Sequence, residues 1–492
     1  MEQDVQQLAA ELKQRLEADA SILGDFQALL QYLPDCEYEL ISFMVAQNVW
    51  KGFIPPPPTG YKKGDGTVDL GLILYWLNNP LLIDQSMFSP HEKLLFDALI
   101  IILDLSLPSS QMTTVNADFF KTNELIYTDG SVLSTKQWAT YDQGWLVAVL
   151  NLLQSTIYDL WYWGPTLPTT PPPVIQLNKI STGTVKLAVI GDCGTGDYTL
   201  QRIMQSIYKE KPDYILHVGD VYYAGTPTAN GPHGDKFFFP GEETSNLNFF
   251  WPPDYKGRSF TLNSNHEMYS GAIGYFNDAL DAANGGVNSL FSAQKGSSYF
   301  VLKMGDWVLL GLDSAYQAST TDAFMTGSIG SPTDVQTKFL QQYRPNPAKT
   351  ILFTHHNGFE PDLSAVSPLW AEIRNALGGD PYAWYWGHVH NGLVYKSPVA
   401  IPYAAPSFTT KTYARCLGHA ALPYGPIKPP PYGQIVWQEP NLKPNGKELY
   451  NGWAMLTFTL NNGNVTNIRE DFYDLSRVPP VFSNYIYSTR EE

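Results

Sequence analysis

Apolar runs of strand length, each closed by a polar residue, alternate with helical segments between residues 185 and 390, and this pattern most constrains the fold. The runs are VKLAVIGD (185–192), YILHVGD (214–220), SFTLNSN (259–265), TILFTHH (350–356) and YAWYWGH (382–388). Segments with helical spacing, such as LQRIMQSIYKE (200–210), lie between them. Strands that alternate with helices in this way predict an α/β core.

Two further strand pairs are predicted from local turn chemistry. The stretch SYFVLKMGDWVLLGLDS (298–314) indicates a hairpin that turns at Gly305-Asp306. The stretch GWAMLTFTLNNGNVTNIREDFY (452–473) indicates a second hairpin that turns at NNGN. Short Gly-containing and Asn-containing turns between alternating apolar residues are typical of antiparallel pairs.

Residues 1–163 have a different texture and predict an all-helical region of unknown role. Leu8, Leu12 and Leu16 recur at helical intervals, with Gln, Glu, Lys and Ala between them. The stretch GPTLPTTPPPV (164–174) stops these helices, because repeated prolines stiffen the chain. We therefore expect a helical region over 1–163, a Pro-rich linker over 164–182, the α/β domain over 183–475 and a C-terminal tail over 476–492.

The charge of the chain bears on its partners. The chain has 47 acidic and 31 basic residues, which gives a net charge of −16. Such acidity argues against nucleic-acid binding, which depends on basic surface. It leaves a phosphate-ester substrate open, because bound cations can reverse the local sign of charge.

The cysteines and the apolar stretches bear on the cellular location. Cys36, Cys193 and Cys416 lie far apart, as expected for reduced thiols in the cytosol. The N-terminus lacks an apolar signal core, and the most apolar stretches, 94–107 and 145–163, contain polar residues. We therefore expect a cytoplasmic protein with no transmembrane segment.

The residues that close the apolar runs form a set suited to chemistry. They are Asp192 in GDCG, Asp220 and Tyr223 in GDVYY, Asn265 and His266 in NHE, His355 and His356 in THH, and His388 and His390 in GHVH. The carboxyl ends of strands in an α/β sheet converge on the ligand site, so groups distant in sequence can meet there.

The types of these residues predict a pair of metal ions. Carboxylate, amide and imidazole ligands without a thiolate suit Fe, Mn, Zn or Co and fit Ca poorly. The ligands are too many for one tetrahedral ion with an open position. Two ions that share a carboxylate such as Asp220 can clamp both oxygens of a phosphoryl displacement and acidify a bound water.

The order GDxG, GDxxY, NHE, H and GHxH resembles the calcineurin-like metallophosphoesterase superfamily, specifically its purple acid phosphatase branch, over roughly residues 183–475. The resemblance implies two packed mixed β-sheets flanked by helices, with the site at their shared edge. It implies one metal bound by Asp192, Asp220, Tyr223 and His390. It implies a second metal bound by Asp220, Asn265, His355 and His388. It also implies that His266 contacts the phosphate and assists the leaving group, with Asn265 and His356 as further substrate-binding residues.

Several assignments have rivals within the same motifs. His355 is favoured over His356 as the ligand of the THH motif, and His356 then contacts substrate or orients a neighbour. Tyr223 occupies the position of the iron-binding phenolate, whereas Tyr222 is interpreted as a packing aromatic. The Tyr223 assignment predicts Fe(III) at that site and a divalent ion (Fe, Mn or Zn) at the other. Ser264 stands where the family usually has Gly, and the family's further substrate histidine is missing, which leaves the general acid open.

These observations predict a dinuclear metallophosphoesterase that hydrolyses phosphomonoesters by attack of metal-bound hydroxide. One alternative is a phosphodiesterase that acts on nucleotide or phospholipid-derived diesters. Another is a noncatalytic scaffold whose N-terminal region binds partners, and a third is a single-metal oxygenase with two histidines and one carboxylate. The aromatic stretch FFFPGEETSNLNFFWPPDY (237–255) is either a packed loop or a wall for a base or lipid.

Overall fold

The computed structural model divides the chain into two compact units. One comprises Met1–Trp161, Ala229–Pro240 and Thr320–Ala323, and the other comprises Tyr162–Thr228, Gly241–Ser319 and Phe324–Glu492. The structure describes 172–489 except 178–179, 197, 231–236, 238–239, 402–406, 423–426, 428–432, 443–448 and 477–478, together with 124–126, 132–134, 148, 151, 152 and 155. Most of the predicted helical region and linker therefore lies outside the described residues.

A short antiparallel pair is described in the first unit. Strand β1 (Glu124–Ile126) pairs with β2 (Val132–Ser134), with Leu125 opposite Leu133. These residues depart from the expectation that 1–163 is all helical, because that expectation rested on helical spacing elsewhere in the region.

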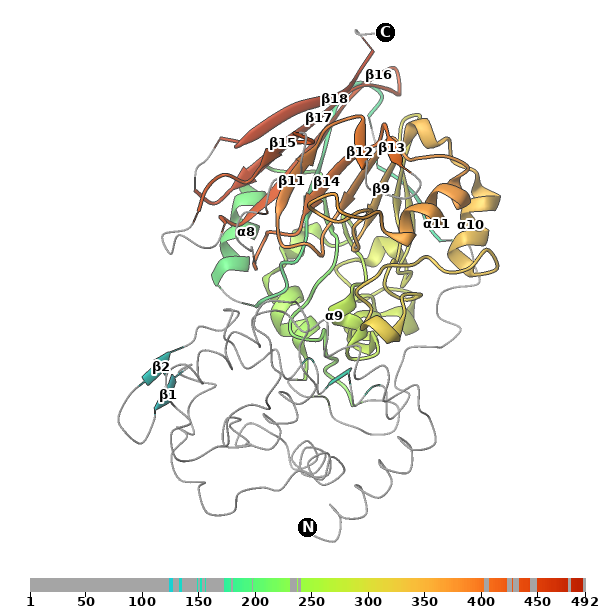
Figure 1. The fold of residues 1–492 in the computed structure, drawn as a ribbon. Coiled ribbons are helices and arrows are strands. Elements are labelled where there is room, and N and C mark those ends of the chain that lie inside the picture. Colours follow the sequence, from blue (N-terminus) through green and yellow to red (C-terminus); the bar gives the residue numbers. More distant parts are fainter. Residues whose placement is uncertain are drawn as a thin grey trace. The chain divides into compact units, whose positions relative to one another are not determined.

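The second unit is built on two mixed sheets, which confirms the predicted fold class (Figure 1). The eight-stranded sheet has the order β15 (Ile435–Gln438), β11 (Gly392–Tyr395), β14 (Tyr413–Leu417), β10 (Ala383–Trp386), β9 (Thr350–Thr354), β8 (Trp307–Gly311), β7 (Phe300–Met304) and β3 (Val174–Gln176). The six-stranded sheet has the order β18 (Phe482–Ser488), β17 (Asn464–Asp474), β16 (Gly452–Asn461), β4 (Gly183–Ile190), β5 (Tyr214–His217) and β6 (Ser259–Thr261). A separate small sheet pairs β12 (Val399–Ile401) with β13 (Phe408–Thr410).

The pairing within each sheet explains where polar residues gather. Strands β4, β5 and β6 are parallel neighbours, and so are β8, β9, β10 and β14. Each set therefore delivers its carboxyl ends to one edge of its sheet. The two predicted hairpins are confirmed, since Met304 pairs with Trp307 and Asn461 pairs with Asn464.

The core of this unit lies between the two sheets. One buried cluster contains Leu187 and Leu216 from the six-stranded sheet and Ile351, Phe353 and Tyr385 from the eight-stranded sheet. Removing apolar side chains from water on both inner faces stabilises the sandwich by roughly 25 cal/mol for each Å² buried. This packing holds the two sets of strand ends in a fixed relation.

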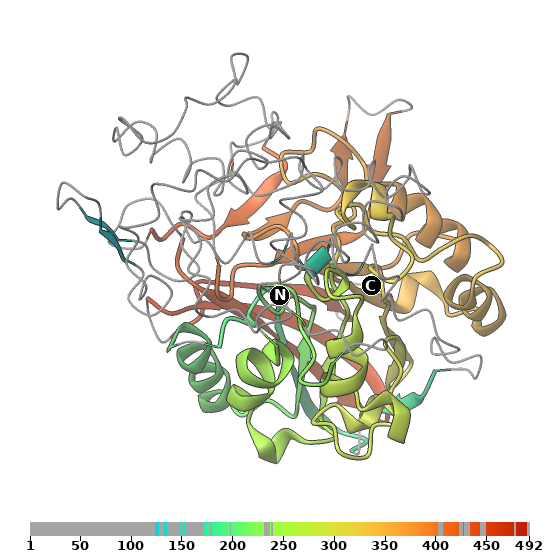
Figure 2. The same cartoon turned by 90° about the horizontal axis from the view of Figure 1, so that it is seen from below.

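Helices flank the sandwich, as seen in Figures 1 and 2. Helix α8 (Tyr198–Lys209) contacts β16, where Nε1 of Trp453 donates to Oγ of Ser206 at 3.1 Å. Helix α10 (Val335–Tyr343) packs on α11 (Pro368–Leu377), and the short helix α9 (Asn265–Met268) follows β6. Helix α11 begins after Ser367, whose hydroxyl accepts from the amide of Leu369, and it ends at Gly378 in a left-handed conformation.

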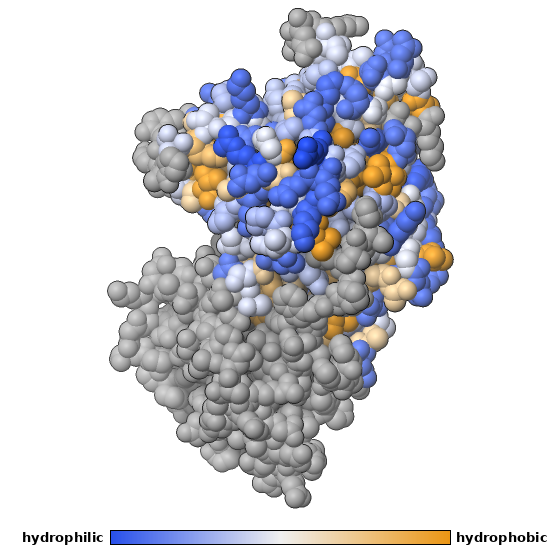
Figure 3. All heavy atoms as spheres, turned by 90° about the vertical axis from the view of Figure 1, so that its right-hand side faces the viewer, coloured by the Kyte–Doolittle hydropathy of each residue, from blue (hydrophilic) through white to orange (hydrophobic). Residues whose placement is uncertain are grey.

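The coloured part of the face drawn in Figure 3 is mainly hydrophilic, with hydrophobic residues in small separate groups. Of the large apolar side chains that the structure describes, Phe249 is the most exposed, at 79%. Among the described helices, none combines the length and the apolar character that a membrane crossing requires.

Candidate metal centre

The predicted site residues follow five of the core elements and are tied together by their main chains. Asp192 follows β4, Asp220 follows β5, Asn265 opens α9, His355 follows β9, and His388 and His390 follow β10. The amide of Asp192 donates to the carbonyl of Gly219 at 2.9 Å, and the amide of Gly387 donates to the carbonyl of His355 at 3.0 Å. The loops after neighbouring strands are thereby locked to one another within each sheet.

Three of these residues have left-handed backbone conformations. The φ angles are 57° for Asp192, 81° for Asp220 and 63° for His388, a region that residues other than glycine rarely adopt. Gly387 is required beside them, because a Cβ atom there would lie 2.3 Å from Oδ2 of Asp192. Strain concentrated at predicted ligands indicates a functional constraint on this loop geometry.

The carboxylate of Asp220 lies between two groups of predicted ligands. Its Oδ1 is 3.2 Å from Nε2 of His355. Its Oδ2 accepts from the hydroxyl of Tyr222 at 2.9 Å and lies 3.7 Å from Nε2 of His390. Each oxygen therefore faces a different set of donors, which is the placement that a shared carboxylate needs.

The first group contains Asp192 and His390. Oδ1 of Asp192 is buried without a hydrogen-bond partner, although Nε2 of His390 lies 3.4 Å away. Burial, and then the charge of Asp220, raise the pKa of Asp192 to about 8. Burial opposes protonation of His390, but contacts with Asp192 and Asp220 outweigh it and raise the pKa of His390 to about 9. Both shifts favour the protonated forms, and a cation bound between these groups would compete with those protons.

The second group contains Asn265, His355 and His388. Oδ1 of Asn265 lies 2.9 Å from Nε2 of His355 and 3.2 Å from Nδ1 of His388. Nδ1 of His355 donates to the carbonyl of Val218 at 2.9 Å, which leaves Nε2 as the unprotonated nitrogen. Burial lowers the pKa of His355 to about 4, so the ring is neutral. Nε2 of His355 and the oxygens of Asp220 and Asn265 therefore converge with lone pairs, an arrangement that fits a metal ion.

The two histidines of the THH motif have different surroundings. Candidate metal-binding sets among the described residues are Asp192–Asp220–His355 and His355–His356–His388, each with ligand atoms within 4.8 Å of one another. However, Nδ1 of His356 lies 2.8 Å from Oγ of Ser314, and its Nε2 donates to the carbonyl of Phe324 at 2.7 Å. Both ring nitrogens of His356 therefore hold neighbouring loops, and His355 is the histidine that faces Asp220.

The two tyrosines of GDVYY have different surroundings in the structure. The hydroxyl of Tyr222, interpreted above as a packing aromatic, lies 2.9 Å from Oδ2 of Asp220 and 3.0 Å from Nε2 of His390. Tyr223 contacts the site through its main chain, since its amide donates to Glu242 at 2.5 Å and its carbonyl accepts from Nδ1 of His266 at 2.7 Å. The phenolate assignment to Tyr223 remains a prediction, and Tyr222 is its rival.

Sequence reasoning missed a segment that positions the ligand loops. The carboxylate of Glu242 accepts from the amides of Tyr223, Ala224 and Thr226 at 2.5, 2.9 and 3.2 Å. Nδ2 of Asn246 donates to the carbonyl of Tyr222 at 2.6 Å, and its own carbonyl accepts from Gly196 at 3.0 Å. Residues 242–246 therefore connect the loop after Asp192 to the loop after Asp220. No motif marks them in the sequence.

Ser264, the residue that departs from the family pattern, contacts the central carboxylate. Its Oγ donates to Oδ1 of Asp220 at 2.5 Å and also contacts the carboxyl group of Glu267. Burial, and then the charge of Asp220, raise the pKa of Glu267 well above its usual value. The Ser264 hydroxyl therefore adds a hydrogen bond to Asp220 that a glycine at this position could not supply.

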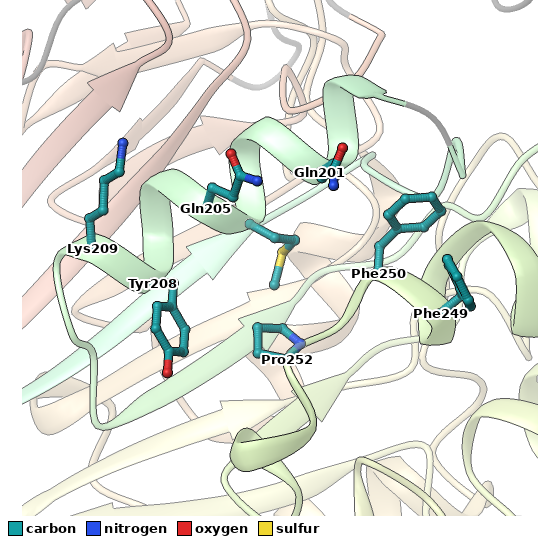
Figure 4. Close-up of a pocket in the computed structure, with 8 residues that line it drawn as sticks. Gln201, Gln205, Tyr208, Lys209, Phe249, Phe250 and Pro252 are labelled. Carbon is teal, nitrogen blue, oxygen red and sulfur yellow. The ribbon is translucent and has the colours of Figure 1, made fainter.

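The aromatic stretch 237–255 contributes to a surface groove beside α8. Phe249, Phe250 and Pro252 line a groove of about 460 Å³ together with α8 residues that include Met204 and Tyr208 (Figure 4). None of the residues that line this groove is a predicted metal ligand. The groove therefore gives no support for an aromatic substrate wall at the metal centre.

Comparisons with known proteins agree with the geometry at the level of the family. The family model described as calcineurin-like phosphoesterase matches residues 185–392. No curated protein sequence matches the chain.

Three similar solved structures have low sequence identity to the chain. GAP50, described as the anchor in the inner membrane complex of Plasmodium, is 11% identical, with a TM-score of 0.40 and coverage of 62% of this chain and 89% of that one. Purple acid phosphatase PPD1 from yellow lupin (Lupinus luteus) seeds is 12% identical, with a TM-score of 0.37 and coverage of 63% and 55%. PhoD is 11% identical, with a TM-score of 0.35 and coverage of 62% and 69%.

Proposed function

We propose, from the membership of residues 185–392 in the calcineurin-like phosphoesterase family, that the chain is a two-metal hydrolase of phosphate esters with a preference for phosphomonoesters. The observation that carries the proposal is the position of Asp220. One of its oxygens faces His355, and the other faces Tyr222 and His390. A carboxylate with ligand groups on both sides can be shared by two cations.

The proposed ligands divide between two ions, and Asp220 belongs to both. The first set is Asp192, Asp220, His390 and one tyrosine of GDVYY. The second set is Asp220, Asn265, His355 and His388. Bound cations of this kind withdraw charge from phosphoryl oxygens and lower the pKa of a bound water. We favour iron at the first position and divalent Fe, Mn or Zn at the second, in keeping with the oxygen and nitrogen ligands.

His266 is the proposed phosphate-contacting residue. Its Nδ1 donates to the carbonyl of Tyr223, which fixes the orientation of the imidazole. The residue is 7% exposed, whereas Asp192 and His355 are fully buried. Burial is the main cause that lowers the pKa of His266, and a bound phosphate dianion would counter it by favouring the protonated ring. The protonated imidazole would then donate a hydrogen bond to the substrate.

The test is turnover of the full-length, metal-loaded protein on a matched panel of phosphomonoesters and phosphodiesters. We expect monoesters to be hydrolysed with the higher kcat/KM, and elemental analysis to give two metal ions for each chain. Turnover of diesters alone would replace the monoester proposal with the phosphodiesterase alternative. A protein that binds two metals but hydrolyses no member of the panel would contradict the proposed function and favour the scaffold.

The tyrosine ligand can be identified by colour. A phenol ionises readily only against a strong Lewis acid, so a bound phenolate indicates Fe(III) at the first position. Because the Tyr222 hydroxyl lies beside Asp220 and His390, we expect Tyr222→Phe to abolish the visible absorption of the Fe(III)-loaded protein. Tyr223→Phe is the matched control and should keep the band. Loss of the band in Tyr223→Phe alone would assign the ligand to the position that the family pattern predicts.

A further inference from the structure

The hydroxyl of Tyr269 lies beside the predicted metal ligand Asn265. Asn265 opens α9, and Tyr269 caps its C-terminus four residues later. Side chains four residues apart on a helix lie on the same face. Nδ2 of Asn265 donates to Oη of Tyr269 at 3.0 Å. The turn of α9 therefore places a phenol next to the second group of ligands.

The amide of Asn265 has two different sides. Its oxygen faces Nε2 of His355 and Nδ1 of His388, the side of the candidate metal ion. Its nitrogen faces Tyr269. Because the amide nitrogen is the donor in this contact, the hydroxyl oxygen uses a lone pair for it and directs its own proton to another acceptor.

The sulfur of Met325 is a weak acceptor for this hydroxyl, and the contact is long. The hydroxyl of Tyr269 donates to Sδ of Met325 at 3.8 Å. A thioether sulfur accepts hydrogen bonds weakly, whereas a phosphate oxygen accepts charge-assisted ones. Exchange of the sulfur for a phosphoryl oxygen would therefore favour binding of the anion.

Tyr269 shares the more exposed side of the centre with His266. The two rings are 5.0 Å apart in an edge-to-face arrangement, and each residue is 7% exposed. Met325 and His388 are partly exposed as well. Asp192, Asp220 and His355 lie deeper, at 0–1% exposure. Tyr269 and His266 are therefore more accessible than these three predicted ligands, and they lie next to each other.

We propose that the hydroxyl of Tyr269 binds the phosphoryl group of the substrate through a hydrogen bond to one of its nonbridging oxygens. The identity of the ligand as a phosphoryl group rests on the proposed function. The chain carries no histidine between His356 and His388. In this proposal the hydrogen-bond donor beside Asn265 is instead the Tyr269 hydroxyl, at the end of α9. Tyr269 would then bind the substrate, whereas the predicted ligand side chains would bind the metal ions.

The test compares Tyr269→Phe with the wild type in the full-length, metal-loaded protein. Inorganic phosphate binding is measured by calorimetry, and kcat/KM is measured on aryl and alkyl monoesters. Loss of one hydrogen bond to a charged group predicts phosphate binding weaker by about tenfold or more, and kcat/KM lower by roughly 10- to 100-fold on both classes. Tyr255→Phe is the matched control, because it removes a phenol of similar burial that bonds the carbonyl of Pro212.

Each outcome decides the assignment. Phosphate affinity within twofold of the wild type would overturn it, and so would a loss of activity confined to alkyl esters, which would place the hydroxyl on the leaving oxygen. If the wild type binds phosphate but hydrolyses no ester, weaker binding by Tyr269→Phe would support this inference and refute the hydrolase. Absence of phosphate binding by the loaded wild type would overturn both.

Discussion

Asp220→Asn is expected to lower kcat by at least about 10³-fold and to reduce the metal content below two ions per chain. The substitution keeps the shape of the side chain and removes the charge that both proposed ions share. Oδ1 and Oδ2 of Asp220 face His355 on one side, and Tyr222 and His390 on the other, so both halves of the centre lose a charged ligand atom. Loss of a preorganised electrostatic contact alone costs roughly 10²–10³ in kcat, and loss of a metal costs more.

Elemental analysis and steady-state kinetics check this expectation on the same preparations. Asp306→Asn is the control, because it makes the same chemical change at the β7–β8 turn, where Asp306 pairs with the surface residue Lys349. It should keep both metals and full activity. Two tightly bound metals together with undiminished turnover in Asp220→Asn would refute the shared carboxylate.

The strands and their polar ends were predictable, because each signal was local. Apolar runs of strand length close at Asp192, Asp220 and His355, and the Gly305-Asp306 and Asn462-Gly463 turns specify their hairpins. The order of strands was not predictable from such signals. β16, near the C-terminus, pairs with β4 more than 250 residues earlier. Neither strand contains a local sequence signal that identifies its partner strand.

The convergence of the candidate site residues was predictable as far as strand ends determine it. Residues that close parallel strands meet because the sheet brings them together, whatever the loops do. The choice between Tyr222 and Tyr223 depends instead on the path of one loop, which is held by Glu242 and Asn246. Alternation along a strand cannot settle a side-chain direction in such a loop. The contact between Ser264 and Asp220 was not predictable for the same reason, because no sequence motif marks a serine hydroxyl that contacts a carboxylate.

Arg415→Met is expected to destabilise the sandwich unit by about 3–5 kcal/mol. Arg415 of β14 and Glu470 of β17 form an ion pair between the two sheets, and the two residues are 1% and 0% exposed. Nη2 of Arg415 lies 2.6 Å from Oε1 of Glu470, and Nε lies 2.9 Å from both carboxylate oxygens. Removing the guanidinium leaves a buried carboxylate without its cation, which is the costly way to break such a pair. Urea unfolding monitored by tryptophan fluorescence measures the change.

A double variant separates two contributions to the free energy of unfolding: the cost of leaving Glu470 buried without its partner, and the net contribution of the ion pair. In Arg415→Met with Glu470→Met, no charge remains between the sheets, so we expect much of the lost stability to return. Lys349→Met removes one partner of the exposed pair with Asp306 and should cost about 1 kcal/mol or less, because water screens surface charges. A single Arg415 variant as stable as Lys349→Met would mean that water or another residue compensates the loss of the guanidinium at Glu470. In that case apolar burial alone would account for the packing of the two sheets that sets the predicted metal ligands opposite one another.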